Sequence, residues 1–174
     1  MGIKLCAAVY LSSPGGEQAP WFGLLLVYLM GFAIEVFGVN TGAVFGTYEY
    51  GSGLGPKLMH TPLLIGLNWL MLVYSTHLMC HGFKINAILK TLFAALSMTL
   101  YDVVLEQVAP LLNMWHWENG LVPAKNYLAW LVVSFVMHLV FRISKVQYTN
   151  HIAVFLFIVQ FVFFAGLHLV TKIY

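Results

Sequence analysis

Three of the six acidic residues in this chain lie inside long apolar stretches, where charged groups are rare. Glu35 lies near the end of one stretch, and Asp102 and Glu106 lie near the end of another. A charge at the centre of a membrane-spanning helix costs about 2.5–3.5 kcal/mol, so such residues usually face the interior of a helical bundle. These three carboxyl groups are therefore the first candidates for acid–base chemistry.

The spacing of Asp102 and Glu106 puts both carboxyl groups on one face of a helix. They are four residues apart, which is about one turn, or roughly 5.4 Å of rise. Two carboxyl groups this close in a low dielectric resist ionising together, so one of them is expected to stay protonated. A general acid requires such a neutral carboxyl group. The alternative is that the three carboxyl groups only make polar contacts between helices.

The composition indicates that a lipid bilayer surrounds this chain. Of its 174 residues, 61% are hydrophobic and only 8% are charged, whereas a soluble domain carries about 25% charged residues. The mean hydropathy of +0.86 agrees. The eight Lys and Arg residues are scattered and form no basic stripe, which argues against a nucleic-acid partner.

Five apolar stretches approach the roughly 20 residues that a transmembrane helix needs. The pattern predicts an all-α, polytopic transmembrane helical bundle that forms one integral membrane domain over residues 1–174. A short segment before residue 13 has an apolar run too short to span a membrane. Pro110 is expected to end the third helix. The predicted spans cover residues 21–39, 58–80, 85–109, 126–144 and 151–170.

Helix counting places the three carboxyl groups on the same side of the membrane, because odd-numbered spans run in the same direction. Glu35 also shares a helical stripe with Gly31, Gly38 and Gly42, and small residues let a neighbouring helix approach closely. The cations divide five against three between the two sides, and the positive-inside rule favours a cytoplasmic N-terminus. The first group is Lys4, Lys84, Lys90, Arg142 and Lys145, and the second is Lys57, Lys125 and Lys172.

Further polar and aromatic residues gather at the end of the spans that carries the carboxyl groups. One interpretation is an interfacial belt of aromatic side chains, which is common in membrane proteins. The other is an aromatic-lined slot for a long apolar ligand, in which ring faces stabilise a cation. The residues concerned include Asn40, Thr41, Tyr48, Tyr50, His60, Asn68, Trp115, His116, Trp117 and Asn126.

A pair of histidines at the opposite end has the spacing of a metal site. His77 and His81 are four residues apart with Cys80 between them. Two ligands do not make a site, and membrane di-iron enzymes need several closely spaced histidine boxes, which the seven scattered histidines do not provide. We therefore predict no metal.

Several motifs between Glu35 and Trp130 resemble the membrane carotenoid hydratases of the CruF type. The first block runs through EVFGVNTG, FGTYEY, LGPKL and PLLIGLNW, and the second through DVVLE, WHW and NYLAW. Two features depart from the pattern: Gln107 stands where a proline is expected, and the N-terminal helix looks reduced to residues 4–12. The second departure leaves the exact topology open.

The resemblance implies addition of water to the terminal C=C bond of an acyclic carotenoid, which gives a tertiary alcohol. Protonating that alkene makes a tertiary carbocation, so the enzyme needs an acid, a group that stabilises the cation, and a directed water molecule. The reaction is redox-neutral, and the sequence shows no flavin, nicotinamide or iron motif. We therefore expect a cofactor-independent hydro-lyase, integral to the plasma membrane of a prokaryotic cell.

The expected site combines the carboxyl groups with the polar and aromatic residues of the motifs. Asp102 or Glu106 is expected to donate the proton, and Glu35 to orient the water as a base. The substrate-binding candidates are Tyr48, His60, Asn68, Trp69, Trp115, Trp117, Asn126 and Trp130.

Other functions remain open from the sequence. A carotenoid end-group cyclase or isomerase needs the same first protonation but excludes water. A proton-coupled transporter would also use buried acids, although it favours polar residues spread across the membrane and some repeat symmetry. A non-catalytic carotenoid-binding or assembly subunit is a further alternative. For the hydratase, the expected partners are the carotenoid, water, the lipid bilayer and other carotenoid-pathway enzymes.

Overall fold

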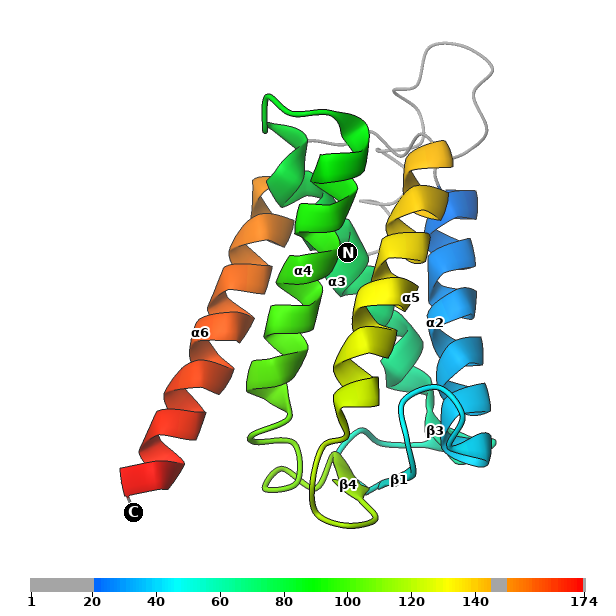
Figure 1. Ribbon diagram of the computed structural model, residues 1–174, viewed down its shortest axis with the longest axis vertical. Helices are drawn as coiled ribbons and strands as arrows, with labels where there is room; N and C mark the ends of the chain where they lie inside the picture. Colours follow the sequence, from blue (N-terminus) through cyan, green and yellow to red (C-terminus); the bar gives the residue numbers. More distant parts are fainter. Residues whose placement is uncertain (1–20, 145–149, 174) are drawn as a thin grey trace, which may run out of the picture.

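The computed structural model describes residues 21–144 and 150–173, and within them the chain is a bundle of five long helices (Figure 1). Each helix is long and apolar enough to cross a membrane, at about 1.5 Å of rise per residue. This confirms the predicted all-α membrane bundle. The helices are α2 (Trp21–Thr41), α3 (Leu63–His81), α4 (Ala87–Leu105), α5 (Ala124–Ile143) and α6 (His151–Ile173).

Helix α3 is the centre of the bundle and packs against the other four helices. Helix α4 lies between α5 and α6, and α2 closes the opposite side beside α5 (Figure 1). Helix α6 is the most peripheral, since only Ala153 and Phe157 of its side chains are buried. Apolar side chains such as Leu29 and Val132 point outward, as expected for a surface that contacts lipid.

Glycines let α2 and α3 approach closely, as the small-residue stripe predicts. A Cβ atom at Gly31 would lie 2.5 Å from the Cβ atom of Trp69, and one at Gly66 would lie 2.9 Å from the Tyr28 carbonyl oxygen. Both distances are too short for any side chain. The close contact holds Trp69 against the face of α2 that carries Glu35.

Two short β-ribbons connect the helices at the end where α2 and α4 finish. Strand β1 (Tyr48–Tyr50) pairs antiparallel with β4 (Trp115–Trp117), and β2 (Lys57–Leu58) pairs with β3 (Thr61–Pro62). The first ribbon joins two loops that lie more than 60 residues apart in the sequence, and it covers the end of the bundle (Figure 1). The sequence predicted only loops there, because strands of two or three residues carry too little periodicity to detect.

Helix α3 begins at Leu63, five residues later than predicted. Residues 58–62 belong instead to the β2–β3 hairpin, whose turn residues Met59 and His60 both have positive φ, at 51° and 64°. Two-residue hairpin turns of this kind require positive φ at both positions. The side chain of Asn40 holds the turn by donating to the Met59 carbonyl oxygen at 3.0 Å.

Helix α4 ends at Leu105, four residues earlier than predicted, and Glu106 follows it as the C-terminal capping residue. Pro110 explains the difference, because a proline ring clashes with the carbonyl group four residues earlier, which here belongs to Glu106. The chain therefore leaves the helix before Glu106 rather than at the proline itself. The remaining helix ends agree with prediction to within a few residues, and the N-terminal segment lies outside the described residues.

Candidate active site at one end of the bundle

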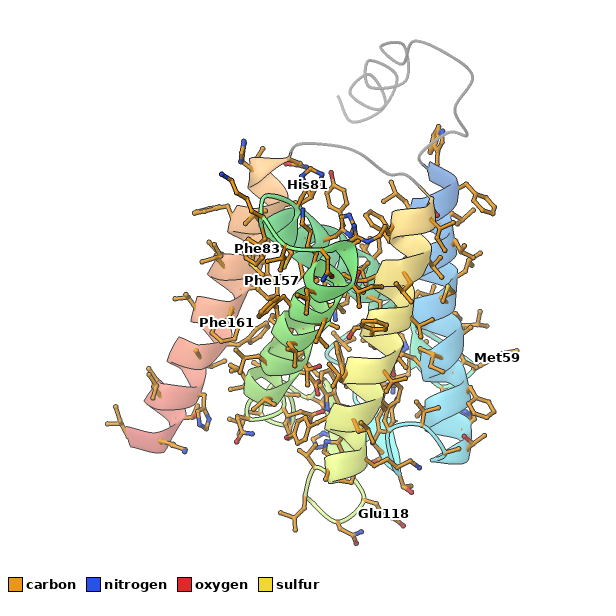
Figure 2. All side chains as sticks on the ribbon, turned by 45° about the horizontal axis from the view of Figure 1, so that its top comes forward. Met59, His81, Phe83, Glu118, Phe157 and Phe161 are labelled. Carbon is orange, nitrogen blue, oxygen red and sulfur yellow. The ribbon has the colours of Figure 1, made fainter. Side chains whose placement is uncertain are left out.

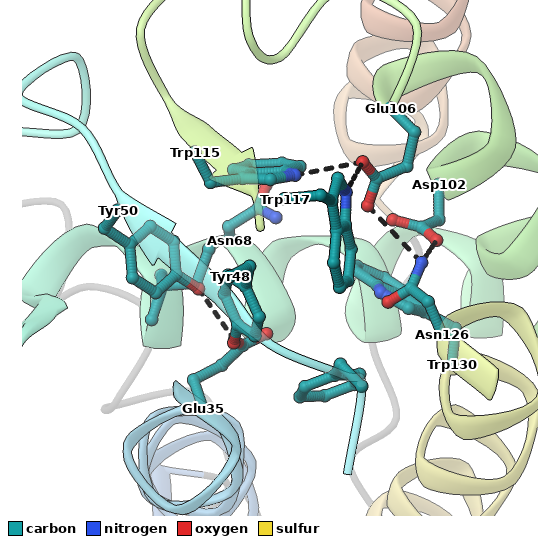
Figure 3. Close-up of a pocket in the computed structure, with 12 residues that line it drawn as sticks. Glu35, Tyr48, Tyr50, Asn68, Asp102, Glu106, Trp115, Trp117, Asn126 and Trp130 are labelled. Atoms are coloured by element: carbon teal, nitrogen blue, oxygen red, sulfur yellow. Dashed lines mark hydrogen bonds between the residues drawn. The ribbon is translucent and has the colours of Figure 1, made fainter. Parts of the chain in front are cut away.

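The helix ends and the β1–β4 ribbon enclose a small cavity at the end of the bundle that carries the carboxyl groups (Figure 3). About 20 Å³ of it admits the centre of a water molecule, which is room for about one water. Three carboxyl groups, two amides, six aromatic rings and one isoleucine line the cavity. They are Glu35, Asp102, Glu106, Asn68, Asn126, Phe45, Tyr48, Tyr50, Trp115, Trp117, Trp130 and Ile65.

Glu35 is held by three hydrogen-bond donors, none of which is charged. Its Oε2 atom accepts from the hydroxyl groups of Tyr48 at 2.6 Å and Tyr50 at 2.7 Å, and its Oε1 atom accepts from Trp69 Nε1 at 2.9 Å. The side chain is only 4% exposed. A buried carboxyl group with donors on both oxygens is arranged as an ionised carboxylate.

Glu106 is held in the same way on the other side of the cavity. Its Oε2 atom accepts from Trp117 Nε1 at 2.8 Å and from Trp115 Nε1 at 3.0 Å. Its Oε1 atom accepts a longer hydrogen bond, 3.3 Å, from the amide of Asn126. Two indole N–H groups on one oxygen again favour the carboxylate form.

The β1–β4 ribbon supplies four of these donors because side chains alternate along a strand. Tyr48 pairs with Trp117, and Tyr50 pairs with Trp115. All four rings are buried and point into the cavity, whereas Glu49, between the two tyrosines, is exposed. The ribbon therefore presents tyrosine hydroxyl groups to Glu35 and tryptophan N–H groups to Glu106 (Figure 3).

Asp102 differs from both glutamates in its hydrogen bonds. Its Oδ2 atom accepts from Asn126 Nδ2 at 2.7 Å, but its Oδ1 atom is buried and has no partner among the described residues. The side chain is completely buried. Leaving a charged oxygen buried and unpaired is costly, so this geometry favours the protonated acid at Asp102.

Burial also acts on the titratable groups that lie outside the helices. It raises the pKa of Glu106, the Trp117 and Trp115 hydrogen bonds act in the opposite direction, and the charge of Glu35 raises the pKa slightly more. Burial and the nearby charge of Glu35 raise the pKa values of Tyr48 and Tyr50 far above the usual range for tyrosine. Both hydroxyl groups therefore stay protonated donors at any physiological pH.

Aromatic contacts hold the donors in place. Trp69 and Trp130 stack with ring centroids 4.2 Å apart and an angle of 19° between their planes. Tyr48 lies 5.1 Å from Trp117, and Tyr50 meets Trp115 edge to face at 6.2 Å. Stacked and edge-to-face rings are favourable contacts beyond the area that they bury, so these contacts stabilise the positions of the donors around the cavity.

The structure brings together most of the residues that the sequence analysis selected. The three carboxyl groups line the cavity, and so do Tyr48, Asn68, Trp115, Trp117, Asn126 and Trp130. Trp69 reaches the site through Glu35 and the stacking on Trp130.

His60 does not reach the cavity. It is exposed, and its Nδ1 atom lies 2.9 Å from Asn40 Oδ1, so that it holds the β2–β3 turn. Conversely, Phe45 and Ile65 line the cavity without having been selected, and Tyr50 lines it although it was named only in the aromatic group and not among the substrate-binding candidates. The alternation Tyr-Glu-Tyr at residues 48–50 was the signal for Tyr50, since a strand would place both tyrosines on one face.

The histidines at the opposite end show no arrangement of metal ligands. His77 packs edge to face on Phe141 at 5.0 Å and lies 6.2 Å from the ring of His138. His81 is exposed at the end of α3. Within residues 21–144 and 150–173, no group of three His, Cys, Asp or Glu side chains is placed to hold a metal ion.

Comparison with known proteins identifies relatives of this chain. The sequence profile of the family described as "Carotenoid biosynthesis protein" matches residues 3–174. The chain is also 29% identical over 149 residues to a protein of Haloarcula japonica named bisanhydrobacterioruberin hydratase. That alignment covers 81% of this chain and 50% of the relative, so the chain spans about half of the relative's length. No solved structure matches.

Proposed function

Because this chain belongs to the carotenoid biosynthesis protein family, we propose that it is a hydratase that adds water to the terminal C=C bond of an acyclic carotenoid. The product is a tertiary alcohol. A hydratase among its relatives supports the reaction class. The observation that carries the proposal is the contrast inside the cavity, where two carboxyl groups are fully supplied with donors and the third, Asp102, has one buried oxygen without any.

Asp102 is the proton donor in this proposal. The π electrons of the terminal double bond take the proton from Oδ1, a C–H bond forms at the less substituted carbon, and Asp102 is left as a carboxylate. The tertiary carbon becomes the cation. Asn126, which already donates to Oδ2 at 2.7 Å, stabilises the carboxylate that this step produces.

The two glutamates and the surrounding rings stabilise the cation. Glu35 and Glu106 are bound by neutral O–H and N–H groups, so their negative charges are not cancelled by a cation. Preorganised charges in a site without bulk water are the largest contributors to many rate enhancements. The faces of Trp117 and Tyr48, which lie between the two glutamates in Figure 3, add cation–π attraction.

Water completes the reaction by attacking the tertiary carbon. Asn68 is half-buried on the cavity wall and makes no side-chain hydrogen bond within the described residues, so its amide is free to orient a water molecule. Glu35 Oε1 accepts one hydrogen bond and retains a lone pair for the proton that the water loses. Exchange with water returns this proton to Asp102, and the net reaction is alkene plus water giving alcohol.

This reaction transfers no electrons between molecules, and we propose that it proceeds without a cofactor. The substrate is long and apolar and therefore reaches the enzyme through the lipid. We expect the enzyme to work in the plasma membrane of a prokaryotic cell, such as the one that carries its relative.

The decisive experiment is expression of the chain in cells that make an acyclic carotenoid, followed by mass analysis of the pigments. Hydration adds the mass of one water for each modified end. A cyclase or isomerase leaves the mass unchanged and alters the chromatographic retention and the absorption spectrum instead. An unchanged pigment profile, with the protein present in the membrane, would contradict the proposal.

A further inference from the structure

The end of the bundle opposite the cavity carries a group of cations on α4, on α5 and in the connection between α3 and α4. Arg142, in the last turn of α5, donates from Nε to the buried hydroxyl group of Thr91 on α4 at 3.4 Å. Lys90, the residue before Thr91, donates from Nζ to the His81 carbonyl oxygen at the end of α3, at 2.7 Å. Because Lys90 and Thr91 are neighbours in the sequence, these two bonds place both cations at the α3–α4–α5 junction.

A third cation and a helix terminus lie at the same junction. Lys84 is exposed in the short connection between α3 and α4. Helix α4 begins there, capped by Asn86, and its first turn contains no acidic residue. The amino-terminal end of a helix carries a partial positive charge, so it adds to the positive potential.

No described carboxyl group balances this charge. The acidic residues within residues 21–144 and 150–173 are Glu35, Glu49, Asp102, Glu106 and Glu118, and all lie at the cavity end. Figure 2 shows the separation, with His81 and Phe83 at one end of the bundle and Glu118 at the other. The terminal nitrogens of Arg142 have no hydrogen-bond partner in the described part of the chain.

Exposed apolar side chains neighbour each cation in the sequence. Phe83 precedes Lys84 and is 44% exposed, Leu89 precedes Lys90 and is 40% exposed, and Ile143 follows Arg142 and is 79% exposed. A ligand for this surface therefore needs an anionic group for the cations and hydrocarbon for the apolar side chains beside them. Basic pockets between transmembrane helices bind lipid headgroups through this combination.

We propose that Arg142, Lys90 and Lys84 form a binding site for the phosphate headgroup of an anionic phospholipid. The phosphodiester lies against the α3–α4–α5 junction and accepts hydrogen bonds from the terminal nitrogens of Arg142, which have no partner among the described residues, while the acyl chains lie along exposed apolar side chains such as Phe83 and Ile143. A bound lipid would hold the three helices together at the end where, in the described chain, neither strands nor carboxyl groups join them.

Native mass spectrometry of the purified protein tests this site without any carotenoid, so its result is independent of the proposed hydratase activity. The protein is titrated with phosphatidylglycerol and, separately, with phosphatidylcholine of the same acyl chains. We expect phosphatidylglycerol to be retained preferentially. The double variant Lys90→Gln/Arg142→Gln should lose about fivefold in affinity for each charge removed, because one cation near an anionic lipid contributes about that factor.

A matched control removes the same charge from the other end. Lys125→Gln/Lys172→Gln should bind phosphatidylglycerol like the parent protein. Arg142→Lys keeps the positive charge and should retain most of the lipid binding, so it separates the effect of losing the charge from the effect of changing the side chain. Thermal unfolding of every variant shows whether a loss of binding comes from misfolding instead. Equal binding by the parent and by Lys90→Gln/Arg142→Gln would overturn the site. Displacement of the lipid by an equal concentration of inorganic phosphate would overturn its assignment to a lipid.

Discussion

The two ends of this helical bundle carry charged groups of opposite sign, with carboxyl groups buried at one end and cations at the other. At the cavity end, Glu35 and Glu106 are buried and bound by tyrosine, tryptophan and asparagine side chains. At the other end, the hydrogen bonds of Arg142 and Lys90 to described residues go to a hydroxyl group and a carbonyl oxygen. Neither end, within the described residues, pairs a carboxylate with a cation, and the charge of each end is therefore available to a ligand.

The absence of such pairs among the described residues is clearest at the cavity end, where two lysines are present but bind backbone carbonyl oxygens instead of the buried carboxyl groups. Lys57 donates to the Tyr50 carbonyl oxygen, and Lys125 donates to the Gly42 carbonyl oxygen at 3.2 Å. Pairing a lysine with Glu35 or Glu106 would neutralise the charge that stabilises the carbocation in the proposed mechanism. Neutral donors stabilise the carboxylates and leave their net charge in place, which is an arrangement suited to stabilising a positive transition state.

Replacing Asp102 should have the largest effect on the cavity end. Asp102→Asn keeps the size of the side chain and its contact with Asn126, but removes the acidic proton. We expect hydration to fall about 10²–10⁴-fold, the usual contribution of a general acid, as measured by the fraction of hydrated pigment. The amount of variant protein in the membrane should be unchanged, and a variant as active as the parent would remove Asp102 from the mechanism.

Replacing Glu35 should have the next largest effect. Glu35→Gln preserves an acceptor for Tyr48 and Tyr50 but removes the negative charge, and we expect a loss of about 10²-fold in rate, comparable to the removal of one electrostatic contributor in other enzymes. The same pigment assay measures it. Retained activity would show that Glu106 alone balances the cation.

Removing one indole donor should change the pH dependence more than the maximal rate. The Trp117 hydrogen bond lowers the pKa of Glu106, so Trp117→Phe should raise that pKa. The proposed mechanism needs Glu106 ionised, so activity should fall as the pH drops and Glu106 becomes protonated. In the Trp117→Phe variant this fall should occur at a higher pH than in the parent protein. A pH–rate profile in isolated membranes measures the shift, and Tyr74→Phe, outside the cavity, should leave the profile unchanged.

A change at the opposite end should have the smallest effect. His77→Phe keeps an aromatic ring against Phe141 and lies far from the cavity, so we expect hydration within about twofold of the parent. A large loss of hydration in this variant, with the protein still folded, would show that the end that carries His77 also takes part in the reaction, and would contradict the proposed separation of a catalytic end from a lipid-binding end.

Short-range patterns in the sequence are enough to predict much of this molecule. The apolar stretches predict the five helices, because each must bury its backbone polar groups in its own hydrogen bonds when it crosses lipid. The direction of alternate spans predicts that Glu35 and Asp102 lie at one end. Glycine spacing predicts that a neighbouring helix approaches this face of α2 closely, and the structure shows that α3 does so at Gly31.

The loops were much harder to predict, as Tyr50 and His60 illustrate. Tyr50 reaches Glu35 only because β1 pairs with β4, a contact between residues more than 60 positions apart. His60 is polar and close in sequence to the site residues, yet the positive φ values of the hairpin turn direct it to Asn40 instead. Neither outcome follows from local propensity, since each depends on which distant segment a loop meets.

The sequence by itself determined that this is a membrane bundle with three acidic residues at one end, because burial of apolar length and helix direction are local properties of the chain. Only the tertiary structure decided which carboxyl oxygen of the three acids is left without a donor among the described residues. Four of the five indole and phenol groups that bind Glu35 and Glu106 come from β1 and β4, in loops that meet only when the helices pack, and the fifth, Trp69, comes from α3. None of them reaches Asp102 Oδ1, which has no partner among the described residues.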